Sequence, residues 1–257
     1  MIHKEFSVGS NPDIDVHIQS GRVDIKCGVA GIVKVDVDTK AAGFVVEQRG
    51  DQIHISSEKN KGWSSVDSAY VVVEVPADSD ATIAAASAKI EIDAPLRDLN
   101  VKTASGDIDV VEARNATIKT ASGDARLGEV LNDVKVSSAS GDINLGESGG
   151  KVNFSSASGD LFIGENSGAV TAATASGDVV IERLSGRQAI VKSMSGEVEI
   201  GVPPGTRVDL DATLMSGNLH TPEPSEGSEP SKHQMSIKVK LVSGDLRIHR
   251  VAWPPSG

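Results

Sequence analysis

The segment TASGDIDV at 103–110 opens a run of near-identical segments in this chain. The pattern returns as TASGDARL at 120–127, SASGDINL at 138–145, SASGDLFI at 156–163 and TASGDVVI at 174–181. Each copy joins a small hydroxyl residue to Ala-Ser-Gly-Asp and then to alternating apolar residues. Copies this closely spaced leave no room for a helix, so the repeat predicts a stacked array of β-coils.

Three looser copies follow the regular run: SMSGEVEI at 193–200, LMSGNLHT at 214–221 and LVSGDLRI at 241–248. The serine before each glycine recurs every 17 to 19 residues through Ser195, and then after 21 and 27 residues. The stretch TPEPSEGSEPSKHQ at 221–234 has three prolines and no aliphatic or aromatic residue, which predicts a solvent loop and accounts for the longest spacing. The segment 237–253 is then expected to complete the last coil.

Alignment on the serine of Ser-Gly shows which side chains face inward. The positions six and four before it and three and five after it are apolar in nearly every copy, as in Val134, Val136, Ile143 and Leu145. This pattern predicts two strands per coil, each with one buried face. The glycine recurs in all eight copies, as expected for a corner that needs positive φ and close backbone approach.

We therefore predict an all-β chain that forms a single-stranded parallel β-solenoid, of the right-handed β-helix or β-roll type, with about 18 residues per coil. Residues 1–86 alternate less regularly and include AYVVVEVP at 69–76. They are predicted to form an irregular β N-terminal cap, because an open solenoid end exposes unpaired backbone. Residues 87–257 form the repeat solenoid, and both parts make one continuous domain.

Composition narrows the classes of partner. The net charge of -11 opposes binding to nucleic acid and to anionic membrane surfaces, which both depend on cationic contacts. Cys27 is the single cysteine, so no intramolecular disulfide is expected. No signal peptide and no run of 18 apolar residues is visible, so membrane insertion is not expected. The prediction is a cytoplasmic protein, or a cell-surface protein if a leader was removed or missed.

Three parts of the sequence together resemble a bacterial β-strand-repeat family of unknown function that is often labelled "putative adhesin". They are VVVEVPADSDATI at 71–83, the tandem SASGDI units and VPPGTRVDLDATLMSG at 202–217. The resemblance covers most of residues 65–250 and implies a parallel β-helix-like fold. It carries over no functional residues.

An acidic ladder follows the Ser-Gly corners and is the sharpest candidate for a metal site. Its regular members are Asp107, Asp124, Asp142, Asp160 and Asp178, and Glu197, Asn218 and Asp245 continue it. Stacked carboxylates repel by roughly 1 kcal/mol in water, and a file of bound Ca²⁺ would relieve that repulsion. The favoured interpretation is structural, in which each aspartate accepts backbone N–H bonds at its own corner.

Two further columns of side chains define the coil surfaces. Phe162 and Val180 fall on the outer face of the second strand and form a candidate partner-binding patch. The hydroxyl residue that opens each copy falls on the inner face, where it is expected to bond along the stack. This column comprises Thr103, Thr120, Ser138, Ser156 and Thr174.

No catalytic residue is predicted. GESGG around Ser148 matches the G-x-S-x-G nucleophile pattern, but that pattern has meaning only at a strand-to-helix turn with a histidine and an acid nearby. The six histidines have no zinc-site spacing. No cofactor is expected, and a small-molecule ligand is disfavoured.

The leading hypothesis is a non-enzymatic β-solenoid that serves as a protein-interaction scaffold or adhesin-like binding module. A self-assembling, filament-forming β-helix is the first alternative, because exposed coil ends can stack. A carbohydrate-active β-helix enzyme is the second. It is disfavoured because Trp63, Tyr70 and Trp253 all lie outside the regular coils, where they cannot form a stacking platform for sugars.

Overall fold

The structure is a computed structural model that describes residues 1–40, 43–57, 68–222 and 233–252. Within these ranges the chain forms β-strands and no helix, which confirms the all-β prediction, and none of these residues forms a helix suited to crossing a membrane. The chain divides into two compact units, 1–130 and 131–257. Trp63, Trp253, the final residues and positions 223–232 of the expected solvent loop lie outside the described residues.

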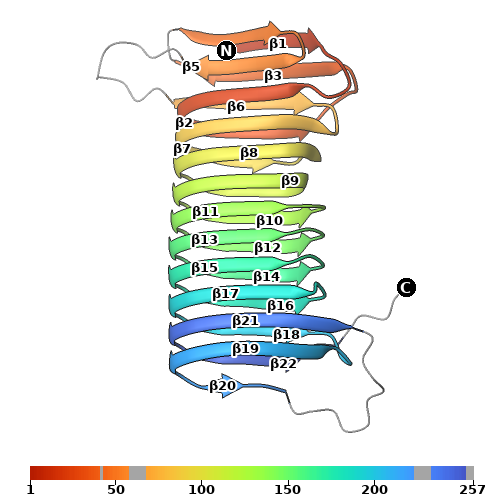
Figure 1. Cartoon of the computed structure of the whole chain (residues 1–257). Helices are drawn as coiled ribbons and strands as arrows, with labels where there is room; N and C mark the ends of the chain where they lie inside the picture. Colours follow the sequence, from red (N-terminus) through yellow and green to blue (C-terminus); the bar gives the residue numbers. More distant parts are fainter. Residues whose placement is uncertain (41–42, 58–67, 223–232, 253–257) are drawn as a thin grey trace. The chain divides into compact units, whose positions relative to one another are not determined.

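Unit 1 contains ten strands (Figure 1). They are β1 (Ile2–Ser7), β2 (Asp13–Cys27), β3 (Ile32–Thr39), β4 (Phe44–Arg49), β5 (Gln52–Ser57), β6 (Ser68–Val75), β7 (Ser79–Ile92), β8 (Leu96–Ser105), β9 (Ile108–Ser122) and β10 (Ala125–Val130).

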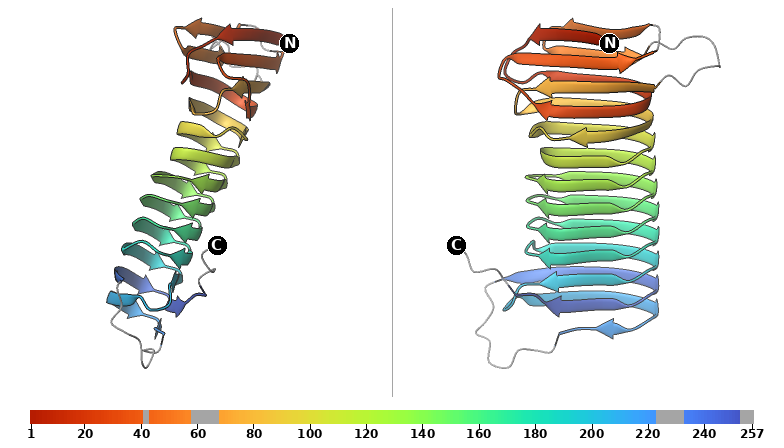
Figure 2. Two further views of the ribbon diagram at one scale, coloured as in Figure 1. Left: turned by 90° about the vertical axis from the view of Figure 1, so that its right-hand side faces the viewer. Right: turned by 180° about the vertical axis from the view of Figure 1, so that it is seen from behind.

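The later strands of unit 1 pair in parallel, and its first strands do not. β7, β8, β9 and β10 pair in parallel, with Ser105 opposite Ser122. β2 lies parallel to β7 from Asp13 to Ile25, so this early segment is already a coil in register with the repeat. β1 and β3 run antiparallel to their neighbours, as does β4 against β5. These antiparallel strands are among the red and orange elements of Figure 2, which also include the parallel strand β2.

Unit 2 contains the remaining twelve strands. They are β11 (Val134–Ser140), β12 (Ile143–Ser148), β13 (Val152–Ser158), β14 (Leu161–Asn166), β15 (Val170–Ser176), β16 (Val179–Leu184), β17 (Gln188–Ser195), β18 (Val198–Val202), β19 (Arg207–Ser216), β20 (Leu219–His220), β21 (Gln234–Ser243) and β22 (Leu246–Arg250).

The strands of unit 2 form two facing series of parallel strands, but their order in space departs from their order in sequence. One face runs β11, β13, β15, β17, β21, β19, and the other runs β12, β14, β16, β18, β22, β20. The coil β21–β22, last in sequence, therefore lies between the coils β17–β18 and β19–β20 (Figure 1). The expectation that it would end the stack is wrong.

The burial of inward side chains explains why the β21–β22 coil, and not the β19–β20 coil, lies next to β17–β18. The inward residues of β21 are almost fully buried, with Ile237 and Val239 both at 0% exposure. The inward residues of β19, including Leu210 and Leu214, are only half-buried, and β20 is just two residues long. A coil between two neighbours buries apolar surface on both sides, so the more apolar coil gains most from the inner place. The β19–β20 coil is shorter, because β20 has only two residues, and a short strand is the safer open edge.

The predicted inward columns form the core. Their aliphatic side chains are buried throughout the inner coils, and the β19–β20 coil is the exception because nothing among the described residues stacks beyond it. The corner glycines take positive φ as predicted, for example 134° at Gly159. A Cβ on Gly159 would lie 2.3 Å from the carbonyl oxygen of Gly141, so both conformation and space require glycine.

Candidate functional site

The column of small hydroxyl residues is structural. Thr103, Thr120 and Thr174 are buried, and each Oγ1 donates to the carbonyl of the serine two residues ahead, at 2.8 to 3.1 Å. Ser156 makes the same bond at 3.0 Å. The inward placement was predicted correctly, but these four bonds close their own corners and do not run along the stack. The reason is that the bend brings the next carbonyl within reach of the hydroxyl. Ser138 is the exception, because its Oγ is buried and has no hydrogen-bond partner among the described residues.

The aspartate ladder links successive corners through the backbone. Oδ1 of Asp142 accepts the N–H of Asp160 at 2.9 Å, and Asp160 accepts that of Asp178 at 2.8 Å. In unit 1, Asp107 accepts the N–H of Asp124 at 3.2 Å. Each carboxylate thus binds the amide of the neighbouring coil, whereas the sequence argument placed that amide at its own corner. No three acidic, histidine or cysteine side chains of the described part are grouped to hold a metal ion.

Ser148 and Tyr70, which the sequence disfavoured as a nucleophile and as a sugar-stacking platform, have structural partners. Ser148 is 3% exposed, and its Oγ donates to the carbonyl of Asn132 at 3.3 Å. Tyr70 donates its hydroxyl to Asp24 at 2.7 Å and lies beneath the Arg22 guanidinium, 5.7 Å from the ring centre. Neither side chain is presented as a nucleophile or as an open stacking surface.

Unit 1 gathers one polar cluster that spacing rules did not anticipate. Asp15 bridges two histidines, with Oδ1 2.7 Å from His17 Nε2 and Oδ2 2.9 Å from His54 Nδ1. Asp13 lies on the same strand and accepts from Gln52 at 2.9 Å. Burial raises the pKa of Asp13, the Gln52 bond opposes this, and the charges of Asp15 and Asp80 add to the rise. The sequence alone does not reveal this cluster, because Asp15 and His54 become neighbours only through the pairing of β2 with β5.

The predicted patch of Phe162 and Val180 exists as a contiguous pair. The two residues are direct neighbours on β14 and β16, and both are half-buried on the outer face. Their other neighbours in the row are Asn144 and Glu199, so the apolar area is confined to two side chains.

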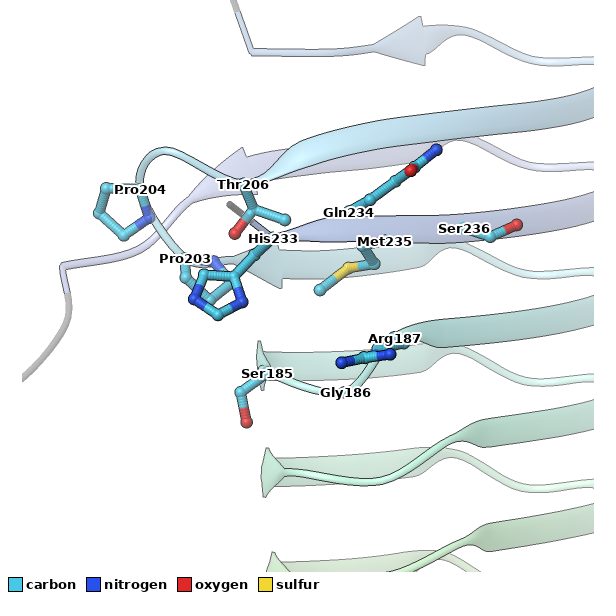
Figure 3. Close-up of a pocket in the computed structure, with 10 residues that line it drawn as sticks. All are labelled: Ser185, Gly186, Arg187, Pro203, Pro204, Thr206, His233, Gln234, Met235 and Ser236. Carbon is cyan, nitrogen blue, oxygen red and sulfur yellow. The ribbon is translucent and has the colours of Figure 1, made fainter. Parts of the chain in front are cut away.

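A cavity of about 870 Å³ opens at the corner opposite the Ser-Gly turns of unit 2 (Figure 3). The turn 185–187 lines one side and the loop 203–206 the other, with His233 and Met235 at the start of β21. Arg250 fixes the loop by donating to the carbonyls of Pro203 and Thr206 at 3.0 and 2.8 Å. The cavity lies where the loop 203–206 leads from β18 to β19 and where β21 begins beside β17.

A second hollow lies on the face formed by β13, β15, β17, β21 and β19, next to the Ser-Gly corners. We call it the methionine groove. It has a volume of about 400 Å³, and the side chains that define it are Lys192, Met194, Thr213, Met215, Lys240 and Val242. Met194 is 62% exposed, Met215 78% and Val242 45%.

The sequence held an unused signal for this groove. The residue before each Ser-Gly serine is alanine in the five regular copies, and it changes to methionine or valine in the three loose copies. Those three coils are adjacent in space, because Ser243 pairs with both Ser195 and Ser216. Three large apolar side chains therefore replace alanine on neighbouring strands, where they gain no burial.

Comparisons with known proteins extend over nearly the whole chain. A crystal structure described as a "putative adhesin" from Parabacteroides distasonis is similar over 96% of both chains, with 16% identity and a TM-score of 0.47. One from Bacteroides fragilis with the same description has 11% identity over 97% of this chain and 96% of its own, with a TM-score of 0.36. No curated protein matches. The Toastrack DUF4097 family matches residues 4–251, and the chain therefore belongs to that family.

Proposed function

We propose that this protein is a non-enzymatic, adhesin-like binding module that holds a partner protein in the methionine groove. The observation that carries the proposal is the exposure of Met194, Met215 and Val242 on three adjacent strands. Scattered exposed apolar residues are ordinary on protein surfaces, whereas clustered ones rimmed by charge mark interaction sites. Methionine suits such a surface because its flexible thioether adapts to a partner.

A photo-crosslinking amino acid placed at position 215 tests the proposal in extracts of the native host. We expect a discrete covalent adduct that disappears when Met194 and Val242 are both changed to alanine, the residue that other coils carry. The same crosslinker at Ala121, an exposed alanine at the equivalent position in unit 1, is the matched control. Equal adducts from both positions, or an adduct unaffected by the alanine changes, would contradict the proposal.

Phe162 and Val180 supply a second, smaller contact surface. Their apolar atoms are half-buried by neighbouring strands, so we expect them to contribute less than the groove. A Phe162→Asn variant, which repeats the residue at Asn144, should weaken partner capture only slightly. If Phe162→Asn reduced partner capture as much as the Met194→Ala/Val242→Ala variant does, the main contact surface would be the face that carries Phe162 and Val180.

Self-association is a second candidate function, favoured by the open coil at the end of unit 2. β19 pairs with β21 and with no other strand of the described part. Its free backbone edge and half-buried Leu210 could be covered by a second copy through edge pairing. Sedimentation velocity over a wide range of concentrations tests this candidate. A dimer that is lost on Leu210→Glu supports it, and a monomer at every concentration excludes it.

A further inference from the structure

Two lysines lie side by side in the methionine groove. Lys192 on β17 is directly opposite Lys240 on β21, and both side chains are exposed. Like charges opposite each other on neighbouring strands are destabilising. No carboxylate of the described residues forms an ion pair within 4.0 Å of either ammonium group. Asp211 pairs with Lys238 at 2.6 Å, and the pKa of Asp211 is lowered chiefly by that bond and further by the charge of Lys240.

The lysines and the apolar side chains form two parallel rows across the strands. Lys192 and Lys240 make one row, and Met194, Val242 and Met215 make the other, two residues further along each strand. The rows are therefore separated by about 7 Å. The apolar row crosses two strand spacings, which is about 9.6 Å.

These dimensions fit a helix better than an extended segment. Three apolar residues at i, i+3 or i+4 and i+7 of a helix span about 10.5 Å. Three same-face residues of a strand span about 13.6 Å. A helix laid along the apolar row would bring the residues beside its apolar stripe over the two ammonium groups, where carboxylates would be matched.

Unit 1 shows that a lysine pair alone does not make such a surface. Lys102 is directly opposite Lys119 in the same repeat positions, and the residues corresponding to the methionines are Ala104 and Ala121. A facing lysine pair is thus tolerated where there is no apolar row beside it. The groove in unit 2 combines both rows.

We propose that the methionine groove docks an amphipathic helix of a partner protein that carries acidic side chains along one side of its apolar stripe. The inference rests on the proposed function and adds the chemistry of the partner. The helix-in-groove mode supplies affinity through its apolar anchors, and the lysines select the sign of the charge beside them.

Two synthetic helices with the same leucine stripe test the inference, one flanked by glutamates and one by lysines. Each is titrated into the full chain with ¹³C-methyl methionine as the NMR probe. The glutamate helix should shift the Met194 and Met215 methyl signals at lower concentration than the lysine helix. In Lys192→Glu/Lys240→Glu its affinity should fall by about tenfold, or 1.4 kcal/mol, while the lysine helix should gain affinity.

Lys102→Glu/Lys119→Glu is the matched control, because it changes the net charge equally without touching the groove. It should leave the affinity of both helices nearly unchanged. Equal binding of the two helices at Met194 and Met215 would contradict the acidic character of the partner, but it would still agree with the groove as a docking site. Binding of neither helix would overturn the helical partner, and the crosslinking experiment would still decide the proposed function independently.

Discussion

At the scale of the residue, a Ser-Gly corner that begins with threonine, such as 174–178, combines three structural roles. A buried hydroxyl closes the bend on a nearby carbonyl, the glycine provides a positive φ, and the aspartate accepts an amide of the adjacent coil. Together they leave few backbone groups of the corner without a partner, which matters because a buried unpaired group costs about 1–3 kcal/mol.

Gly159→Ala should destabilise the protein more than Gly205→Ala. Both glycines have positive φ, 134° and 72°, but only Gly159 also has a carbonyl oxygen in the place of the new Cβ. Around Gly205 nothing lies within 4 Å. We expect a loss of about 1 kcal/mol at Gly205 from backbone strain and about 2–4 kcal/mol at Gly159. Urea unfolding measures both, and equal losses would contradict the steric argument.

Asp160 should be replaceable by asparagine but not by alanine. Asparagine keeps an oxygen for the N–H of Asp178 and removes the repulsion from stacked carboxylates. We expect Asp160→Asn to be neutral or stabilising and Asp160→Ala to cost about 1 kcal/mol. Added Ca²⁺ should leave the melting temperature of the unmodified protein unchanged. A melting temperature that rises with Ca²⁺ and is insensitive to it in Asp160→Asn would restore the metal-site hypothesis.

Asp13→Asn should stabilise the protein at pH 7 and have no effect at pH 3. Because burial raises the pKa of Asp13, its protonated form is favoured in the folded state. That contribution is complete below the ordinary pKa and is lost as the pH rises through the folded-state pKa. Asparagine keeps the oxygen that accepts from Gln52 and carries no charge. Calorimetry should show a rise in melting temperature on the order of 1 °C at pH 7.

At the scale of the element, the order of the last coils is the least sequential part of the fold. β21 takes partners on both sides that precede it in the chain. Lys240 is therefore the neighbour of both Lys192 and Thr213, while Lys192 and Thr213 are separated by one whole strand.

Paired cysteines test this order directly, in a chain that also carries Cys27→Ser. Lys192→Cys with Lys240→Cys should form a disulfide, because adjacent strands lie about 4.8 Å apart and disulfides need Cα atoms about 4.4–6.8 Å apart. Thr213→Cys with Lys240→Cys should do the same. Lys192→Cys with Thr213→Cys should remain reduced, since two strand spacings separate them. Mass spectrometry distinguishes these outcomes. A Lys192→Cys/Thr213→Cys disulfide together with a reduced Lys192→Cys/Lys240→Cys pair would restore the sequential order.

Sequence reasoning reached the repeat but not the order of its last members. The alternation around Val134 and Ile143 predicted the buried columns, and the recurrent glycine predicted the corner, because both depend on one coil only. The exchange of β19 and β21 depends on which coil buries more apolar surface when it has a neighbour on both sides. Three coils share the same serine register, so pattern matching cannot rank them. The three loose copies would be neighbours in either order, so the apolar row of the methionine groove could have been found in the sequence, and only the pairing of Lys192 with Lys240 depends on the exchange.

At the scale of the whole molecule, the repeat makes stability a sum over neighbouring coils. Within unit 2, residue 134 faces residue 152 and residue 152 faces residue 170, so one coil can be removed without changing the register of the others. The chain should tolerate such a loss far better than a conventional globular domain of similar size.

Deletion of residues 159–176 should give a folded, shorter protein. The deletion joins Ser158 to Gly177 and preserves the Thr/Ser-Ala-Ser-Gly-Asp corner. We expect an unchanged circular dichroism signal per residue and a lower but cooperative melting transition. Deletion of residues 159–167 is the matched control, because its odd length turns every following inward side chain outward. Similar stability of the two deletions would contradict a repeat held by register.

The exchanged coils also bear on how the chain is completed during synthesis. Most coils find their neighbour about 18 residues after they emerge, but β17 meets β21 only after the intervening β19–β20 coil has been made. Loop closure slows as the contacting segments become more distant in sequence. A nascent chain synthesised only to about residue 220 would contain the β17–β18 coil but not the β21–β22 coil that pairs with it in the folded protein. The translation of residues 221–250 is therefore the interval in which this protein is most exposed to misassembly and chaperone capture.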